Sequence, residues 1–308
     1  MQFEGIHHIS AITGDARRNL DFYTRVLGLR LTAKTVNQDD PGVYHLFYGD
    51  EHAKPGLDLT FFEYPGAAPG RAGEGMIHRV AWRVGSPAAI DFWSERLADS
   101  GVETEREGSN LLFRDPEGLE HELLVADVSD EPLIAEHPEV PAEHALQGFH
   151  AVRAYSSDPE RSRELLEEGL GFERSGEAWE ARGDERGGLI FYDGPPSERG
   201  IQGAGTVHHV AWNSADEDHV AWQQQVAQHG AHPTQVIDRH YFKSIYFREP
   251  SGVLFELATP SPGFTIDEPL ETLGEKLSIP PRLEELRAQI EATVKPLVNP
   301  RTAERTQA

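Results

Sequence analysis

The sequence predicts an α+β protein made of four copies of one β-α-β-β-β module. Four short strands that contain histidine begin at Ile6, Ile77, Phe149 and Val207, which lie 71, 72 and 58 residues apart. An amphipathic helix that ends near a glycine follows each of these strands, and two or three strand-like runs follow each helix. At 308 residues the chain is long enough for two ordinary domains.

One helix is expected in each module, over residues 16–27, 87–100, 159–168 and 216–228. Asp15, Ser86 and Asp158 precede the first three helices and can cap them, and Pro87 suits a first helical position. A fifth helix is expected over Pro281–Val294, where apolar residues recur at helical spacing. The residues from about Pro300 onward are expected to be disordered.

Composition excludes several kinds of site and partner. The chain has no cysteine, so disulfides, thiolate catalysis and cysteine-bound zinc are excluded, and any metal must be held by His, Asp or Glu. The formal net charge of −24 repels nucleic acid and anionic membranes, and it fits either a high-salt habitat or simple high solubility. No apolar run is long enough to span a bilayer and the first residues do not resemble a signal peptide, so a cytoplasmic location is expected.

Two adjacent positions at the start of the modules distinguish structural from functional histidines. The first position is histidine in all four modules: His7, His78, His150 and His208. The second position is histidine only in modules one and four, as His8 and His209, and is Arg79 and Ala151 in modules two and three. We expect the residue present in every copy to be structural, and the residue restricted to two copies to be functional.

A glutamate completes a candidate metal site. The turns at residues 115–118 and 249–252 lead into strands that carry Glu122 and Glu256, and a glutamate in an apolar strand is costly to bury unless it is paired or binds a metal. We predict that His8, His209 and Glu256 bind one metal ion, whereas Glu122 pairs with Arg79. Two histidines and one carboxylate suit Fe(II) and leave three coordination positions open. Because these ligands come from modules one and four, module one is predicted to pair with module four, and module two with module three.

Four modules with histidine on the first strand and glutamate on the last resemble the vicinal oxygen chelate superfamily, over roughly residues 5–264. Within that superfamily the chain is similar to the ring-cleaving dioxygenases that act on hydroquinones. The motifs that carry this narrower resemblance are Gly5–Ser10, Val207–Val210, Arg239–Tyr246, Gly252–Glu256 and Gly263–Thr265.

The resemblance implies two vicinal oxygen chelate domains with cupped mixed sheets. The first would span residues 1–128, with modules one and two, and the second residues 148–262, with modules three and four. Residues 129–147, rich in proline, glutamate and histidine, would be the linker between them. Residues 263–308 would form a C-terminal extension with one helix.

The implied activity is an Fe(II)-dependent, extradiol-type cleavage of a hydroquinone-like aromatic ring with O₂. The resemblance carries the metal ligands over to His8, His209 and Glu256, with Fe²⁺ as the cofactor and Mn²⁺ as the alternative. Its supporting or substrate-contacting positions map to His7, Ser10, His208, Arg239 and Tyr246, and Ser10 stands where the family has a threonine. The implied partners are a small aromatic substrate and O₂, and association into a homo-oligomer stays open.

Strand geometry adds expectations for single side chains. Adjacent residues point to opposite faces, so His7 and His208 are expected to point away from a cavity that His8 and His209 face, unless the strand twists. Tyr246 is expected to donate to a bound phenolate or O₂ and Arg239 to stabilise negative oxygen, the alternatives being a packed tyrosine and a charge-balancing arginine. Surface or packing roles are expected for His45, His52 and His240.

Two other functions remain as alternatives. A glyoxalase-like lyase or isomerase uses a redox-inert metal with a fourth protein ligand, which Glu63 could supply. Glu63 directly precedes Tyr64-Pro65-Gly66, however, and this turn favours an exposed strand end. A metal-free protein that binds an aromatic compound needs no ligand set, so the joint presence of His8, His209 and Glu256 argues against it.

Overall fold

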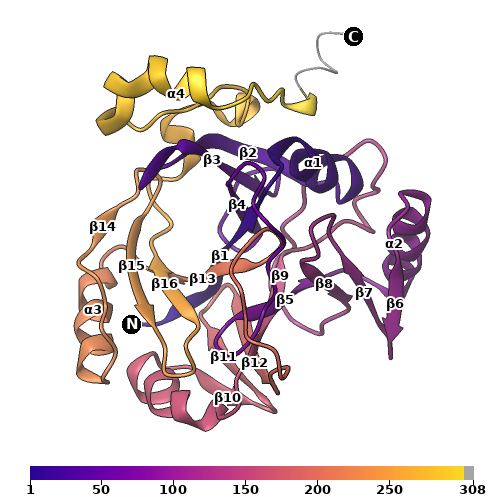
Figure 1. Ribbon diagram of the computed structural model, residues 1–308. Helices are drawn as coiled ribbons and strands as arrows, with labels where there is room; N and C mark the ends of the chain where they lie inside the picture. The colour runs from indigo at the N-terminus through magenta and orange to yellow at the C-terminus, as the bar shows by residue number, and fades with distance from the viewer. Residues whose placement is uncertain (302–308) are drawn as a thin grey trace.

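A computed structural model describes residues 1–301, which form two eight-stranded mixed sheets that meet along β1 (Figure 1). The first sheet has the strand order β14-β15-β16-β13-β1-β4-β3-β2, so it combines modules four and one. Its strands are β1 (Phe3–Thr13), β2 (Arg30–Asn37), β3 (Asp40–Gly49), β4 (Asp58–Glu63), β13 (Val207–Ser214), β14 (Ile237–Asp238), β15 (Lys243–Arg248) and β16 (Leu254–Ala258).

The second sheet repeats this plan with modules three and two, in the order β10-β11-β12-β9-β5-β8-β7-β6. Its strands are β5 (Ile77–Arg83), β6 (Thr104–Glu107), β7 (Asn110–Arg114), β8 (Glu120–Leu124), β9 (Phe149–Tyr155), β10 (Glu173–Ser175), β11 (Ala178–Arg182) and β12 (Gly187–Asp193). In every module the first strand pairs parallel with the last and the other pairs are antiparallel, which makes both sheets mixed.

The modules pair as the ligand argument predicted. Antiparallel pairing of β1 with β13 joins modules one and four, and pairing of β5 with β9 joins modules two and three. Each sheet therefore takes one module from residues 1–128 and one from residues 148–262. The division of the chain into those two domains stays a prediction.

A register irregularity occurs at the repeated histidine of all four first strands. In β1 the partners change from Ile6–Trp212 to His8–Ala211, and in β13 from Ser10–His209 to Ala11–Val207, so His7 and His208 are extra residues. The β5–β9 pair shows the same shifts at His78 and His150. A bulge of this kind bends the strand and redirects the side chain there. The histidine shared by all four modules thus marks a bulge.

The helices follow the predicted positions with some changes of type. They are α1 (Ala16–Asp21) continued by the π-helical turn η1 (Phe22–Val26), α2 (Pro87–Asp99), the 3₁₀ turn η2 (Pro159–Ser162), the π-helical turn η3 (Leu165–Gly169) and α3 (His219–Gln228). The caps at Asp15 and Ser86 are confirmed, since each side chain accepts hydrogen bonds from backbone N–H groups of the first turn.

The predicted third helix is wrong as an α-helix, and Asp158 does not cap it. Glu164 and Glu168 would lie one turn apart on an α-helix, and like charges at this spacing disfavour one. The fourth helix begins at His219, because residues 216–218 form a turn.

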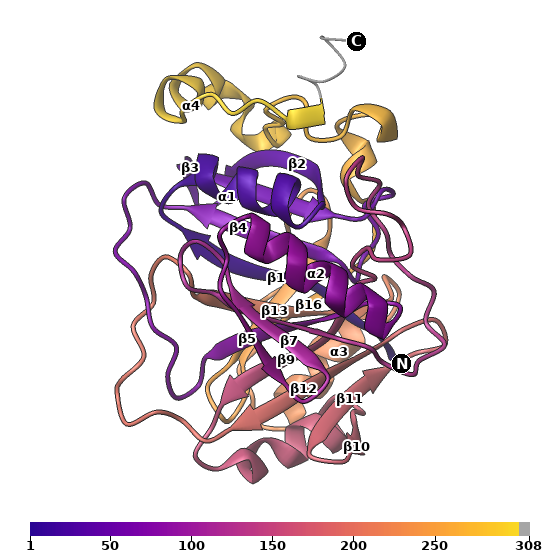
Figure 2. The ribbon, with the colours of Figure 1, turned by 90° about the vertical axis from the view of Figure 1, so that its right-hand side faces the viewer.

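The C-terminal extension packs over β2 and β3 (Figure 1, Figure 2). It contains three 3₁₀ turns, η4 (Phe264–Ile266), η5 (Leu270–Thr272) and η6 (Pro281–Leu286), followed by α4 (Arg287–Thr293). The helix predicted over Pro281–Val294 is therefore α-helical only in its second half. Lys34 Nζ donates to the carbonyl of Leu297 at 2.7 Å, and the Tyr44 hydroxyl donates to that of Lys295 at 2.8 Å. Most residues predicted to be disordered, 302–308, lie outside the described residues.

A buried hydrogen-bonded chain fastens η1 to module two. The Trp82 Nε1–H can only donate, so His121 accepts at Nδ1 (3.0 Å) and carries its hydrogen on Nε2. That hydrogen reaches the Tyr23 hydroxyl at 3.0 Å, and Tyr23 donates to Asp115 at 3.0 Å. Burial lowers the pKa of His121 to about 3, which keeps the ring neutral as this chain requires. The first sheet is thus held against its neighbour by satisfied polar contacts as well as by apolar packing.

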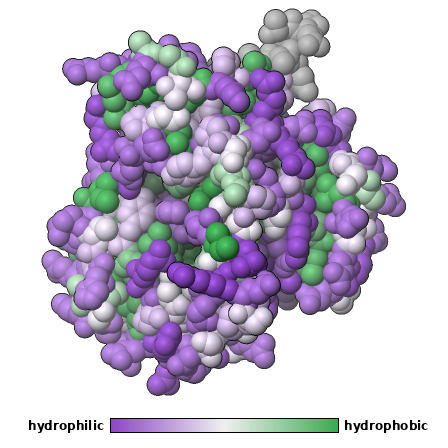
Figure 3. Space-filling model, viewed as in Figure 1, coloured by the Kyte–Doolittle hydropathy of each residue, from purple (hydrophilic) through white to green (hydrophobic). Residues whose placement is uncertain are grey.

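The outer surface in the orientation of Figure 1 is mostly hydrophilic, with apolar residues in small groups (Figure 3). None of the helices within residues 1–301 combines the length and the apolar character that crossing a membrane requires. The cytoplasmic location and the exclusion of nucleic acid stay predictions.

Candidate metal centre and active site

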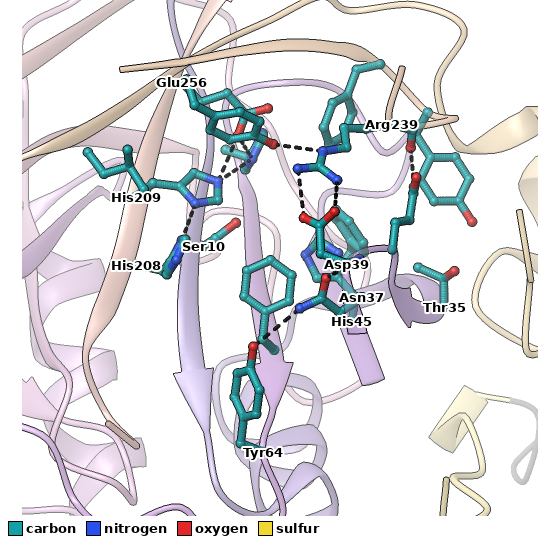
Figure 4. A pocket seen from close by; sticks show the side chains of 18 residues that line it. Ser10, Thr35, Asn37, Asp39, His45, Tyr64, His208, His209, Arg239 and Glu256 are labelled. Atoms are coloured by element: carbon teal, nitrogen blue, oxygen red, sulfur yellow. Dashed lines mark hydrogen bonds and ion pairs between the residues drawn. The ribbon is translucent and has the colours of Figure 1, made fainter. Parts of the chain in front are cut away.

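The first sheet lines a cavity of about 350 Å³ that contains the predicted ligands (Figure 4). His8, His209 and Glu256 are all buried, and they come from the three adjacent strands β1, β13 and β16. The Nε2 atoms of the two histidines lie 3.2 Å apart, and Glu256 Oε2 lies 3.2 Å from His8 Nε2 and 2.8 Å from His209 Nε2. The predicted convergence of these three side chains is confirmed.

The strand registers explain this convergence. His8 lies opposite Ala211 on β13, and Ala211 lies beside Glu256 on β16, so these three residues form one row across the sheet. His209, two residues before Ala211, points to the same face because side chains alternate along a strand. The small side chain of Ala211 leaves space between the larger ligands. Its position in this row was not recognised from the sequence.

The neighbouring histidine sets the tautomer of His8. The carbonyl of Thr259 can only accept, so His7 donates to it from Nε2 at 3.1 Å. Burial, followed by the charge of His8, lowers the pKa of His7 to about 3, so His7 is neutral and its Nδ1 carries a lone pair. That Nδ1 lies 2.9 Å from Nδ1 of His8 and accepts its hydrogen. The Nε2 atom of His8, which faces Glu256, is therefore the nitrogen that is available to a metal ion.

His208 makes the equivalent contact to His209 but lies in a different environment. The two Nδ1 atoms are 2.8 Å apart. If His209 is a metal ligand through Nε2, its Nδ1–H donates to His208, whose own hydrogen is then on Nε2. His208 is exposed and lines the cavity, whereas His7 is buried and is not part of the cavity wall. The expectation that His208 points away from the cavity is wrong, because the bulge in β13 redirects its side chain.

The donor set fits a divalent cation. Ligands about 2.1 Å from one ion and at right angles to each other lie roughly 3.0 Å apart, close to the three observed separations. Neither carboxylate oxygen of Glu256 accepts a well-aligned hydrogen bond from any residue among 1–301. Burial alone would raise the pKa of Glu256, but the adjacent imidazoles hold it well below its ordinary value, so the group is ionised. An ionised carboxylate that is fully buried requires a positive partner, and a divalent cation held by all three side chains would supply it.

Tyr246 and Arg239 line the same cavity. Tyr246 lies opposite Glu256 in the β15–β16 register, and its hydroxyl accepts from Arg239 Nε at 3.3 Å. Burial, followed by the charge of Glu256, raises the pKa of Tyr246, so the hydroxyl keeps its proton and can donate it. Arg239 also pairs with Asp39, with nitrogen–oxygen distances of 3.1 and 2.9 Å (Figure 4). The arginine thus has both a charge partner and a contact inside the cavity.

Ser10 begins a chain of polar contacts that leads across the cavity wall. Its hydroxyl lies 2.7 Å from that of Thr60 on β4, and Thr60 lies 2.9 Å from His45 Nε2 on β3. His45 lines the cavity, so its assignment as a surface or packing residue was incomplete. Apolar walls complete the site; they come from Phe47, Phe62, Phe242 and Leu254. Nothing in the sequence indicated that Asp39 and His45 belong to the site, because the other modules have no equivalent residues in their hairpins.

Three histidines that were not expected to bind the metal lie outside the cavity wall. His78 lies 2.8 Å from Asp193 and stacks on Tyr155. His52 is exposed, and His240 is half-buried and lies 2.8 Å from Asp267, outside the cavity wall.

Glu63 does not have the exposure that the sequence suggested. Its side chain is 8% exposed, and Oε1 accepts from the N–H of Ala16 at 3.0 Å, at the start of α1. The turn after it folds back, and the helix N-terminus supplies the donor that a buried carboxylate requires.

The second sheet provides an internal comparison. Arg79 and Glu122 occupy the positions of His209 and Glu256, and Arg79 contacts both Glu120 and Glu122, as predicted for Glu122. Asn110 also donates to Glu122 at 2.6 Å. This glutamate has cationic and amide partners within the protein. Among the described residues, His8, His209 and Glu256 form the one group that could hold a metal ion.

Comparison with known proteins identifies the family to which this fold belongs. The model of the Glyoxalase/Bleomycin resistance protein/Dioxygenase superfamily matches residues 5–123 and 148–257. The Bacillus subtilis (strain 168) protein named "Putative ring-cleaving dioxygenase MhqA" is 42% identical, over 96% of this chain and all of its own. The chlorohydroquinone/hydroquinone 1,2-dioxygenase of Sphingobium indicum is 33% identical, over 94% of this chain and 96% of its own.

A solved structure supports the same relationship. The crystal structure of a dioxygenase from Bacillus subtilis, described there as putative, superposes with a TM-score of 0.88 at 41% identity, covering 96% of this chain and 98% of that one. The chain therefore belongs to the Glyoxalase/Bleomycin resistance protein/Dioxygenase superfamily, and within it resembles the ring-cleaving dioxygenases.

Proposed function

We propose that the chain is an Fe(II)-dependent, extradiol-type dioxygenase that opens a hydroquinone-like aromatic ring with O₂. The observation that carries this proposal is the triad of His8, His209 and Glu256, which lines a cavity that also has aromatic walls. Two imidazoles and one carboxylate with open positions are typical of non-haem Fe(II) oxygenases. The names of full-length relatives support the choice of ring cleavage and of a hydroquinone.

A ferrous ion held by these three residues would supply adjacent positions where a phenolate oxygen and O₂ exchange electrons. The protein's own contribution begins with the ligands. The hydrogen bond from His8 to His7, continued to the Thr259 carbonyl, fixes the imidazole orientation and leaves Nε2 facing the centre. His7 is therefore a positioning residue. Ser10, which lies opposite His209 and contacts Thr60, helps to fix the strand beside it.

Three hydrogen-bond donors line the cavity that the ligands share. In the metal-bound tautomer, His208 presents Nε2–H to the cavity, Tyr246 presents its hydroxyl, and Arg239 presents its guanidinium. Donors that are fixed before the reaction stabilise the negative charge that develops on oxygen. Partial burial lowers the pKa of His208 to about 4, so the ring is neutral near pH 7 and its Nε2–H acts as a hydrogen-bond donor. We assign hydrogen-bond donation to a bound oxygen atom to His208, proton delivery to Tyr246, and charge stabilisation to Arg239.

The glyoxalase-like alternative lacks its fourth ligand in this geometry. Glu63 caps α1 and is absent from the cavity wall, and no other acidic or imidazole group within residues 1–301 joins the three-residue cluster. The metal-free binding alternative leaves only the two imidazoles to balance the charge of the buried Glu256.

Oxygen consumption in the presence of defined metals tests this function. Protein stripped of metal and reloaded anaerobically with Fe²⁺ should consume O₂ when hydroquinone is added, because the proposed chemistry requires a metal that can transfer electrons. Zn²⁺-loaded and stripped protein should show only the background oxidation measured without protein. Oxygen uptake by Mn²⁺-loaded protein shows whether manganese, the alternative cofactor, also supports the reaction. Oxygen uptake by stripped protein at the rate of the Fe²⁺ form would show that the mechanism is wrong.

Glu256→Gln and Glu122→Gln form a matched pair that tests the metal site. Gln keeps the shape of either side chain but removes its charge, so only the change at position 256 should release the metal. We expect iron affinity to fall by more than the roughly 10–100-fold typical of changes outside the ligand set. Metal content per chain is measured after equilibration with limiting Fe²⁺, and circular dichroism checks the fold. Equal metal loss in both variants would contradict the assignment.

Tyr246→Phe tests proton delivery separately from metal binding. The variant keeps the ring beside His209 but loses the hydroxyl that Arg239 contacts. It should retain iron and cleave hydroquinone roughly 10²–10⁴ times more slowly, as is typical when a positioned acid is lost. Single-turnover kinetics of the Fe²⁺ form measures the effect. Turnover equal to that of the wild type would leave Tyr246 a packing role.

A further inference from the structure

We propose that His45 binds the hydroxyl group at the end of the aromatic ring that lies farthest from the metal ligands. This histidine would select rings with two hydroxyls in para positions over simple phenols. The inference rests on the proposed function, because it takes one ring oxygen to lie beside His8, His209 and Glu256. Neither the repeat pattern nor the resemblance assigned His45 to the site.

The position of His45 in the sheet suits this role. It lies on β3, which is separated from β1 by β4, so its backbone is roughly 10 Å from the strand that carries His8. Both residues line the same cavity. Figure 4 shows His45 apart from the His209–Glu256 pair. Side chains that enter a cavity from these two strands can contact opposite ends of one aromatic ring.

Neighbouring side chains hold the imidazole in a fixed orientation. Its ring lies between Phe47 and Phe62, with centroid separations of 4.0 and 4.2 Å. Nε2 is 2.9 Å from the hydroxyl of Thr60, which in turn contacts Ser10 at 2.7 Å. Within residues 1–301, Nδ1 of His45 makes no hydrogen bond. One ring nitrogen is therefore anchored, and the other remains for a ligand.

The distribution of hydrogen-bonding groups explains which ligand group fits. Near the metal ligands the cavity offers the donors Tyr246, Arg239 and His208, which suit a negatively charged oxygen. At His45 a neutral imidazole offers one nitrogen, either as donor or as acceptor according to its tautomer. Burial lowers the pKa of His45 well below its ordinary value, which agrees with a neutral ring. A phenolic hydroxyl both donates and accepts, so it complements either tautomer.

A site built to bind a hydroxyl group discriminates against an analogue that lacks it, because a polar atom of the protein is then left unpaired. Hydroquinone and phenol differ only in the second hydroxyl. We expect wild-type protein to bind hydroquinone at least about tenfold more tightly than phenol, which corresponds to one net hydrogen bond. His45→Phe keeps an aromatic ring between Phe47 and Phe62 but removes both nitrogens.

The experiment measures binding of hydroquinone and of phenol to anaerobic, Fe²⁺-loaded protein by calorimetry, so it does not depend on turnover. In His45→Phe the affinity ratio of the two ligands should fall to about two, the statistical factor for two equivalent hydroxyls. His45→Asn, whose amide lies close to the position of Nδ1, should recover part of the preference. Phe62→Leu is the control. It removes apolar surface from the cavity wall but no polar group, so the affinities for hydroquinone and phenol should fall by the same factor. Metal content and circular dichroism establish that each variant is folded and loaded.

The outcomes separate this inference from the proposed function. An unchanged affinity ratio in both His45 variants, or a wild type that binds the two ligands equally, would overturn the inference even if hydroquinone is cleaved. A preference for hydroquinone that depends on His45, in protein that never consumes O₂ with it, would support the inference and refute the proposed reaction.

Discussion

The antiparallel pairing of β1 with β13 is the constraint on which the proposed site depends. It brings together two segments about 200 residues apart and places His8 and His209 with their Nε2 atoms 3.2 Å from each other. The parallel pairing of β13 with β16 then adds Glu256 in the same row. No loop supplies a ligand. Ligands on packed strands of one sheet are held by the backbone hydrogen bonds of that sheet, which keeps the donor atoms close to the arrangement that an ion requires.

The bulge repeated in all four modules explains why the histidine at this position has a different role in each of the strands β1, β13 and β5. In β1 the bulged His7 is buried, and it orients His8 through Nδ1. In β13 the bulged His208 makes the same contact to His209 but also reaches the cavity. In β5 the equivalent His78 pairs with Asp193, where no metal ligand follows it. The bulge therefore provides an adaptable position next to each candidate ligand, and the residue after it determines whether the module takes part in a metal site.

Much of this architecture could be predicted from the sequence, because the chain contains four copies of one module that can be compared with each other. Comparison of four module starts separated His8 and His209 from the histidines common to all copies, and the requirement that ligands converge predicted the pairing of β1 with β13. The predictions that failed concerned single residues whose orientation depends on local backbone geometry, which comparison of the modules does not reveal. Strict alternation placed His208 outside the cavity, since a bulge leaves no mark in a single sequence. His45 and Asp39 come from a hairpin that no other module reproduces, and the buried Glu63 accepts a hydrogen bond from the N-terminus of α1.

The proposed function requires that His8, His209 and Glu256 hold one iron ion in the first sheet. Anomalous diffraction at the iron edge, from crystals grown anaerobically with Fe²⁺, tests that claim most directly. We expect a single peak per chain, about 2.0–2.2 Å from Nε2 of each histidine and from a carboxylate oxygen of Glu256. A peak at the Arg79–Glu122 position of the second sheet, or a fully loaded protein with no peak among the three residues, would contradict it.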